Sequence, residues 1–280
     1  MTDKLRVSVL CDNIESGGAK SEHGFALLFE RGENSLLLDT GSTRLFISNA
    51  AALGRDLGRL KAVALSHNHF DHTGGLIALL DEYKDIRPRV YISPHFYKQS
   101  GWRREDEEGL IMPTSSPLSP ELLCRLRARV RYVEAPLLPV PEFEGAYILT
   151  NIERSVDFET IDESDLIYRE DKWIPDDYRD EIALAFETEG GLVVATGCAH
   201  TGACNIIECA RRRLGREVLA AIGGTHLVAH GPERAELTAA WLREKGPKRF
   251  IACHCTGEEG FRALESAGFS RGFCGFCAEF

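Results

Sequence analysis

The residues best suited to metal binding or catalysis form one short run, His-Asn-His-Phe-Asp-His at 67–72. Imidazoles and a carboxylate are ligands suited to zinc, iron or manganese. His67 and His69 are two residues apart, so an extended chain would direct both side chains to the same side. Asp71 and His72 follow where the chain turns and can approach a second point nearby. The run therefore predicts a metal site.

The elements around this run place it where α/β proteins carry out chemistry. The apolar residues 62–65 before it predict a short buried strand, and a helical pattern over 73–83 follows it. The run thus joins the carboxyl end of a strand to a helix. Three more histidines, His200, His226 and His254, each follow a predicted strand. We expect His200 and His254 to join the run as metal ligands, because a catalytic ion needs about three protein ligands.

A repeated pattern predicts the fold. Leu-Leu-Leu-Asp-Thr-Gly at 36–41 resembles Leu-Val-Val-Ala-Thr-Gly at 192–197, and each is followed by a predicted helix and another apolar strand. Two such halves, packed sheet on sheet with helices outside, would form a four-layer αββα sandwich of the α/β class. We expect one domain over 1–280, with insertions around 97–125 and 151–180 that fold over the site. Ordinary surface loops are the alternative for these insertions.

The regular elements that support this prediction are short strands and helices separated by Gly-rich turns. We expect strands at 6–11, 25–30, 35–38, 62–65, 90–92, 182–187, 191–195, 218–222 and 248–252, and helices at 46–53, 73–83, 203–214, 232–244 and 258–267.

Composition excludes several functional classes. A hydrophobic fraction of 44% across 280 residues predicts a sizeable core. The net charge of −10, without basic clusters, argues against a nucleic-acid or membrane-surface partner. The start of the chain lacks a secretion signal, and no apolar run is long enough to span a bilayer. We therefore expect a cytoplasmic protein that acts on a small molecule.

The cysteines predict reduced thiols. Their number, nine, is odd, which does not suit a disulfide framework. Cys274 and Cys277 form a Cys-x-x-Cys pair, and we expect packing thiols there. Cys253 and Cys255 flank His254. In an extended chain both would point away from that imidazole, so neither is expected to be a ligand.

The motifs together resemble a known family. The run at 67–72, the turn at 39–41, His200 and His254 resemble the metallo-β-lactamase-fold superfamily of metal-dependent hydrolases. Further motifs are similar to a subset that includes dihydropterin–ribofuranosylaminobenzene 5′-phosphate synthases. These motifs are Cys11-Asp12-Asn13, Glu22-His23-Gly24, Gly197-Cys198-Ala199-His200, Gly223-Gly224-Thr225-His226-Leu227 and His254-Cys255-Thr256-Gly257.

The resemblance implies an αββα sandwich with one or two divalent ions, for which we expect zinc, with iron or manganese as alternatives. It assigns His67, His69 and His200 to a first ion, and Asp71, His72 and His254 to a second. We expect Asp39 to hold a ligand histidine from behind. Asp12, Asn13 and His23 are expected near the same edge, facing the substrate or supporting the ligands.

One departure from the family pattern affects the charge of the site. The superfamily often has an aspartate that bridges both ions, after the strand that here spans 218–222. Gly223-Gly224-Thr225-His226 follows instead. We count His226 with Asp71 among the catalytic residues, either as a ligand or facing the substrate. Two divalent ions with Asp71 as the one anionic ligand carry about +3, which favours an anionic substrate or weakens the second ion.

We therefore expect a metal-dependent hydrolase. A metal-bound hydroxide, available because coordination lowers the pKa of water to about 7, would attack a small phosphate-containing substrate. A first alternative is a transferase that condenses a dihydropterin pyrophosphate with an aminobenzene ribose phosphate. A pocket for its flat heterocycle would draw on Phe96, Tyr97, Trp102 and Trp173. A second alternative is a metal-binding redox or sensor protein, although His69 stands where a dioxygen-binding site would have Glu.

Overall fold

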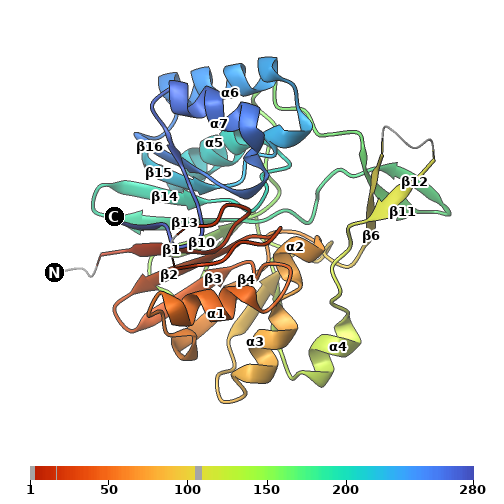
Figure 1. Ribbon diagram of the computed structural model, residues 1–280, viewed down its shortest axis with the longest axis vertical. Coiled ribbons are helices and arrows are strands. Elements are labelled where there is room, and N and C mark those ends of the chain that lie inside the picture. The colour runs from red at the N-terminus through yellow and green to blue at the C-terminus, as the bar shows by residue number, and fades with distance from the viewer. Residues whose placement is uncertain (1–3, 17, 105–108) are drawn as a thin grey trace.

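The fold is an αββα sandwich, as the repeat predicted. The computed structural model describes residues 4–16, 18–104 and 109–280. Two seven-stranded sheets formed by these residues pack face to face, and helices cover both outer faces (Figure 1). Within the described ranges, no helix has the length and apolarity needed to cross a membrane.

The first sheet holds the N-terminal half of the chain. Its strands from β1 to β3 are antiparallel, and those from β3 to β8 are parallel. The C-terminal strand β18 pairs with β1, so the end of the chain supplies an edge strand to the sheet of the first half. In spatial order the strands are β18 (Cys277–Glu279), β1 (Arg6–Cys11), β2 (Ala26–Arg31), β3 (Asn34–Leu38), β4 (Leu60–Ala64), β5 (Arg89–Ile92) and β8 (Arg129–Tyr132). The helices that follow these strands are α1 (Leu45–Ala52), α2 (Phe70–Thr73), α3 (Leu76–Glu82) and α4 (Pro120–Arg125).

The second sheet repeats this plan. The parallel pair β14–β15 matches β3–β4, and both pairs have a register shift near their start, which supports the doubled unit read from the sequence. In spatial order the strands are β17 (Ser270–Arg271), β16 (Arg249–Ala252), β15 (Val218–Gly223), β14 (Gly191–Ala195), β13 (Ala183–Thr188), β10 (Ala146–Leu149) and β9 (Leu137–Pro139). Its helices are α5 (Ala203–Leu214), α6 (Pro232–Lys245) and α7 (Gly257–Ser266).

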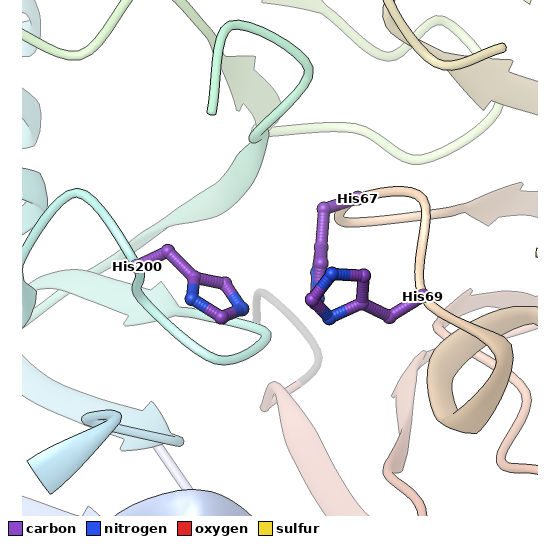
Figure 2. A group of neighbouring side chains, drawn as sticks. All are labelled: His67, His69 and His200. Carbon is purple, nitrogen blue, oxygen red and sulfur yellow. The ribbon is translucent and has the colours of Figure 1, made fainter. Parts of the chain in front are cut away.

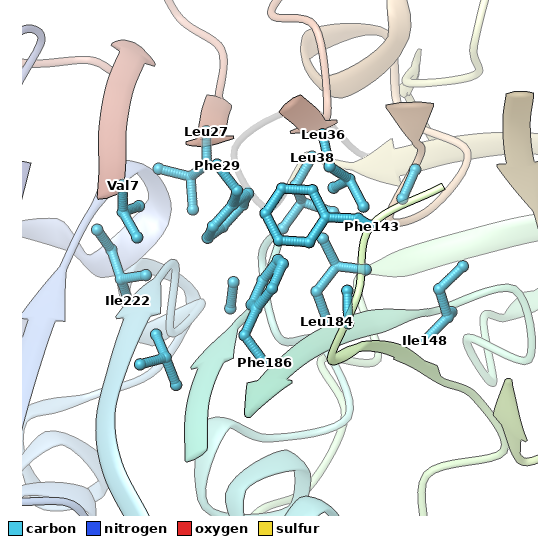
Figure 3. Packing of buried hydrophobic residues seen from close by; sticks show 14 of the residues in the cluster. Val7, Leu27, Phe29, Leu36, Leu38, Phe143, Ile148, Leu184, Phe186 and Ile222 are labelled. Carbon is cyan, nitrogen blue, oxygen red and sulfur yellow. The ribbon is translucent and has the colours of Figure 1, made fainter. Parts of the chain in front are cut away.

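The core lies between the sheets and follows from the two-residue period of a strand. Leu36 and Leu38 face the opposite sheet, whereas Leu37 packs towards the helices. Across the layer, Phe29 stacks on Phe186 with ring centroids 4.4 Å apart (Figure 3). Full burial of one such side chain is worth about 1.5–3 kcal/mol. This packing holds the loops of both halves at one edge.

The helix predicted at 73–83 is wrong in its boundaries. The chain enters α2 three residues earlier, at Phe70, and a break at Gly74 and Gly75 precedes α3. A Cβ on Gly74 would lie 2.1 Å from the carbonyl oxygen of Ser42, and one on Gly75 would lie 2.1 Å from that of Thr40. The two glycines therefore let the metal-site loop pack directly against the turn after β3.

The segments around 97–125 and 151–180 supply a small third sheet rather than irregular loops alone. This four-stranded sheet stands beside the sandwich on the side of α2 (Figure 1). Its strands in spatial order are β12 (Lys172–Pro175), β11 (Asp165–Arg169), β6 (Gln99–Arg103) and β7 (Ile111–Pro113).

Candidate metal centre

Three histidines from the two halves of the sandwich converge. His67 and His69 lie in the loop after β4, and His200 comes from the loop after β14 (Figure 2). Their candidate ligand nitrogens all lie within 4.8 Å of one another. Nε2 of His67 and Nε2 of His200 are buried and have no hydrogen-bond partner among the described residues. Leaving a buried nitrogen unpaired is costly, and a metal ion would use its lone pair. This group therefore fits an ion.

Burial also sets the protonation of these histidines. It lowers the pKa of His67 and His200 well below the ordinary value, and neighbouring imidazoles lower both further. Burial lowers the pKa of His69 to about 4. All three side chains are therefore neutral at pH 7, which is the form that binds metal ions.

A second group surrounds Asp71. Its Oδ2 lies 3.2 Å from Nε2 of His254, 3.7 Å from Nε2 of His72 and 3.2 Å from Nε2 of His23. Burial opposes charge on this carboxylate, but His72 and His254 outweigh burial and lower the pKa of Asp71. His72 and His254 are buried, whereas the His23 side chain is 63% exposed, so the group opens to solvent on the side of His23.

Asp39 lies behind this second group and contacts His72. Its Oδ2 accepts hydrogen bonds from Nδ1 of His72 (2.6 Å) and Oγ of Ser66 (2.7 Å), and its Oδ1 accepts one from the Ser66 amide (2.7 Å). Burial opposes a charge on His72, but Asp39 and Asp71 outweigh it and raise the pKa of His72 to about 9. With Nδ1 engaged by Asp39, Nε2 of His72 faces the sulfur of Cys198 (3.1 Å) and Oδ2 of Asp71 (3.7 Å). Coordination by His72 stays a prediction.

Asp12 and Asn13 hold His254 in place through hydrogen bonds. Oδ2 of Asp12 accepts a hydrogen bond from the His254 amide (2.8 Å), and Oδ1 of Asn13 accepts one from Nδ1 of His254 (2.9 Å). Burial raises the pKa of Asp12 to about 6. The Asn13 side chain also lies 3.5 Å from Nδ1 of His23, so it links two members of the second group.

Left-handed backbone, which is uncommon outside glycine, recurs in the loops of the site. Asp39, Ala199, His226 and His254 have φ angles of 61°, 59°, 51° and 50°. Each such residue costs about 1–3 kcal/mol and persists only where the surroundings impose it. These turns aim the strand-end side chains inward, and their clustering is typical of functional sites.

The carboxylate of Asp165 in β11 also enters the site, and no sequence pattern predicted it. Its Oδ2 lies 3.4 Å from Nδ1 of His200, 3.4 Å from Nε2 of His226 and 2.5 Å from the hydroxyl of Tyr178. The Tyr178 ring stacks on His200 with centroids 3.8 Å apart. Burial opposes a charge on His226, but Asp165 and Cys255 raise its pKa to about 10. The acidic, aromatic composition of 151–180 was the available signal, but no local motif marked Asp165.

The prediction that both cysteines beside His254 face away from the site is wrong for Cys255. A 3-10 turn, His254–Thr256, replaces the extended chain on which that prediction depended. The Cys255 sulfur therefore lies within 4.8 Å of the ligand atoms of His254 and Cys198. Cys253 does face away and packs in the core between the sheets.

Known proteins of one superfamily resemble this chain. The sequence profile of the metallo-beta-lactamase superfamily matches residues 21–248. The chain is 30% identical over 266 residues to the 7,8-dihydropterin-6-methyl-4-(beta-D-ribofuranosyl)-aminobenzene-5'-phosphate synthase of Methanocaldococcus jannaschii. That match covers 91% of this chain and 88% of the relative.

Solved structures share the fold. Tm1679, described as a metal-dependent hydrolase of the beta-lactamase superfamily, superimposes with a TM-score of 0.84 at 26% identity, covering 99% of both chains. Zinc-bound PqqB from Methylobacterium extorquens has a TM-score of 0.59 at 12% identity, covering 98% of this chain and 100% of that one. The likeness to PqqB concerns the fold alone.

Proposed function

The chain belongs to the metallo-beta-lactamase superfamily, and from this premise we propose that it is a metal-dependent hydrolase of a small, phosphate-containing substrate. One observation carries the proposal. The buried nitrogens of His67 and His200 converge with His69, next to the group around Asp71, and lack hydrogen-bond partners among the described residues. Divalent ions, with zinc expected, supply an activated water and neutralise phosphate charge when bound.

The chain's own residues provide orientation and proton transfer. Asp71 orients the attacking water, because its carboxylate accepts hydrogen bonds and stays ionised at pH 7. Substrate enters from the side of His23, the exposed member of the second group. His226 is 15% exposed and paired with Asp165, so it donates a hydrogen bond to the phosphate at the rim.

Hydrolysis of bis-nitrophenyl phosphate by the zinc-loaded protein tests this proposal. We expect nitrophenol release that is lost on chelation and lost in His67→Ala. His95→Ala is the matched control, because His95 is exposed and belongs to none of the candidate metal groups described above. Release that persists in His67→Ala, or none from the zinc-loaded wild type, would contradict the proposal.

The second candidate is the transferase, and the synthase relative at 30% identity favours it. The prediction that Phe96 lines its pocket is wrong. Phe96 is fully buried in the core under the first layer of helices, with Tyr97 packed against it, and cannot stack on a substrate. Trp102 is 41% exposed on β6, and Trp173 lies on β12 of the same sheet. In the strand pairing Trp102 lies opposite Asp165 and Trp173 opposite Tyr168, so the two indoles are on opposite faces of the sheet and cannot line one pocket.

Pyrophosphate release separates the two enzymes. A transferase releases pyrophosphate from a dihydropterin pyrophosphate only when the aminobenzene ribose phosphate is also present. A hydrolase cleaves a phosphate substrate with water alone. A protein that binds metal and performs neither reaction would support the redox or sensor alternative.

A further inference from the structure

Gly223, the last residue of β15, and Gly224 after it stand where the bridging aspartate is missing, and neither position has room for a side chain. A Cβ on Gly223 would lie 2.3 Å from the carbonyl oxygen of Thr196. A Cβ on Gly224 would lie 2.6 Å from the sulfur of Cys255. At these two glycines the chain has no room for a carboxylate, so a protein anion shared by the two groups would come from another position.

The sulfur of Cys198 lies between the two histidine groups. It is within 4.8 Å of ligand nitrogens of His67 and His72, of His200, and of His254. Two of these histidines belong to the first group and two to the second. Sγ of Cys198 lies 3.1 Å from Nε2 of His72. Cys198 is buried, so water does not compete for its sulfur.

We propose that Cys198 supplies the anionic ligand shared by the two metal positions, in place of the bridging carboxylate. This inference deepens the proposed function, because it assumes that both groups bind ions. The thiol releases its proton to solvent as the sulfur binds, and no oxidant is needed. A thiolate has enough lone pairs to bind two ions. With this thiolate, the net charge of two divalent ions and their anionic ligands falls from about +3 to about +2.

A thiolate ligand also affects which metal the site prefers. A thiolate is a soft ligand and selects zinc, or cobalt as its substitute, over magnesium and calcium. Cys255 has a different role. Its sulfur accepts a hydrogen bond from the His226 amide (3.3 Å) and lies 3.5 Å from the carbonyl oxygen of Cys198. Cys255 therefore fixes the loop that carries Cys198, without being the shared ligand.

Cobalt titration of the metal-free protein tests the assignment. We expect near-ultraviolet sulfur-to-cobalt charge-transfer absorption in the wild type, and its loss in Cys198→Ser. Cys255→Ser should keep the absorption. Cys209→Ser is a matched control, because Cys209 is a buried thiol in α5 whose charged neighbours are Arg212, Arg213 and Glu153 rather than candidate ligands.

Affinity for the second ion provides a further measurement. Cys198→Ser should weaken it about 10-fold or more. Cys198→Asp should restore it without the charge-transfer absorption, because a carboxylate supplies the charge but no sulfur.

Each failure has its own signature. Two cobalt ions bound by the wild type without charge-transfer absorption would overturn the assignment of Cys198 and leave the proposed hydrolase intact. Absorption lost in Cys255→Ser but kept in Cys198→Ser would also overturn it. Charge-transfer absorption in a protein that hydrolyses no phosphate ester would support Cys198 and contradict the proposed function. If Cys198→Ser does not fold, the wild-type spectrum and Cys255→Ser still decide the question.

Discussion

Replacing Asp165 by asparagine keeps the shape of the side chain and removes its charge. The carboxylate is 6% exposed and lies 3.4 Å from a nitrogen of His200 and 3.4 Å from one of His226. His200 is neutral, so the charge pair is the one with protonated His226, and at this separation it is worth about 5 kcal/mol at an effective dielectric constant of about 20. Desolvation of the buried carboxylate offsets much of this. We expect a net loss of about 1.4–2.7 kcal/mol, which is about 10- to 100-fold in zinc affinity or in kcat/KM.

Competition with a chromogenic chelator measures the zinc affinity, and bis-nitrophenyl phosphate hydrolysis measures kcat and KM. Asp171→Asn is the matched control, since Asp171 is exposed in the turn between β11 and β12. Tyr178→Phe keeps the ring stacked on His200 but removes the hydroxyl 2.5 Å from Asp165, and should give a smaller loss than Asp165→Asn. If Asp165→Asn stays within twofold of both the wild type and Asp171→Asn, the argument that Asp165 orients the metal site is refuted.

Three further predictions test other parts of the molecule. Asp39→Asn should weaken binding of the second ion about 10- to 100-fold, because Nδ1 of His72 loses its carboxylate partner; unchanged affinity in an equilibrium metal titration would contradict this. Phe186→Ala should lower the free energy of unfolding in urea by about 3–5 kcal/mol, because the ring is fully buried against Phe29; a loss below about 1 kcal/mol would be inconsistent with close packing there. Burial lowers the pKa of His230 to about 4 in the folded protein, whereas the ordinary value in an unfolded chain is about 6.5. Between these pH values the unfolded chain binds the proton and the folded protein does not, so the stability should decrease as the pH falls from about 6.5 to about 4. His230→Gln should make the fall of Tm over this range shallower, and Tm profiles parallel to the wild type would count against the lowered pKa.

Local patterns were enough to predict the architecture and most of the proposed ligands. Strand periodicity and the repeated units at 36–41 and 192–197 predicted two similar halves, and the structure has them as β3–β4 and β14–β15. The run at 67–72 could be recognised as a candidate metal site, because its residue types rarely occur at such close spacing for another reason. His200 and His254 could be added because parallel strands bring their carboxyl ends to one edge of a sheet.

The helix boundary after this run could not be predicted from the local sequence. Residues 73–83 have helical periodicity, but contacts with Ser42 and Thr40 break the helix at Gly74 and Gly75. Those contacts join elements more than 30 residues apart in the chain. Periodicity carries no information about them, so tertiary packing overrode it.

The sequence by itself determined that this chain builds an αββα sandwich with histidine-rich loops after its strands, because strand period and ligand spacing are local properties. Only the tertiary structure decided which other groups enter the site. Asp165 arrives from a separate small sheet, and Cys255 turns inward because His254 adopts left-handed backbone. The sulfur of Cys198 lies between two groups whose members come from both halves. These placements arise where loops distant in sequence cross, and spacing along one chain segment does not encode such crossings.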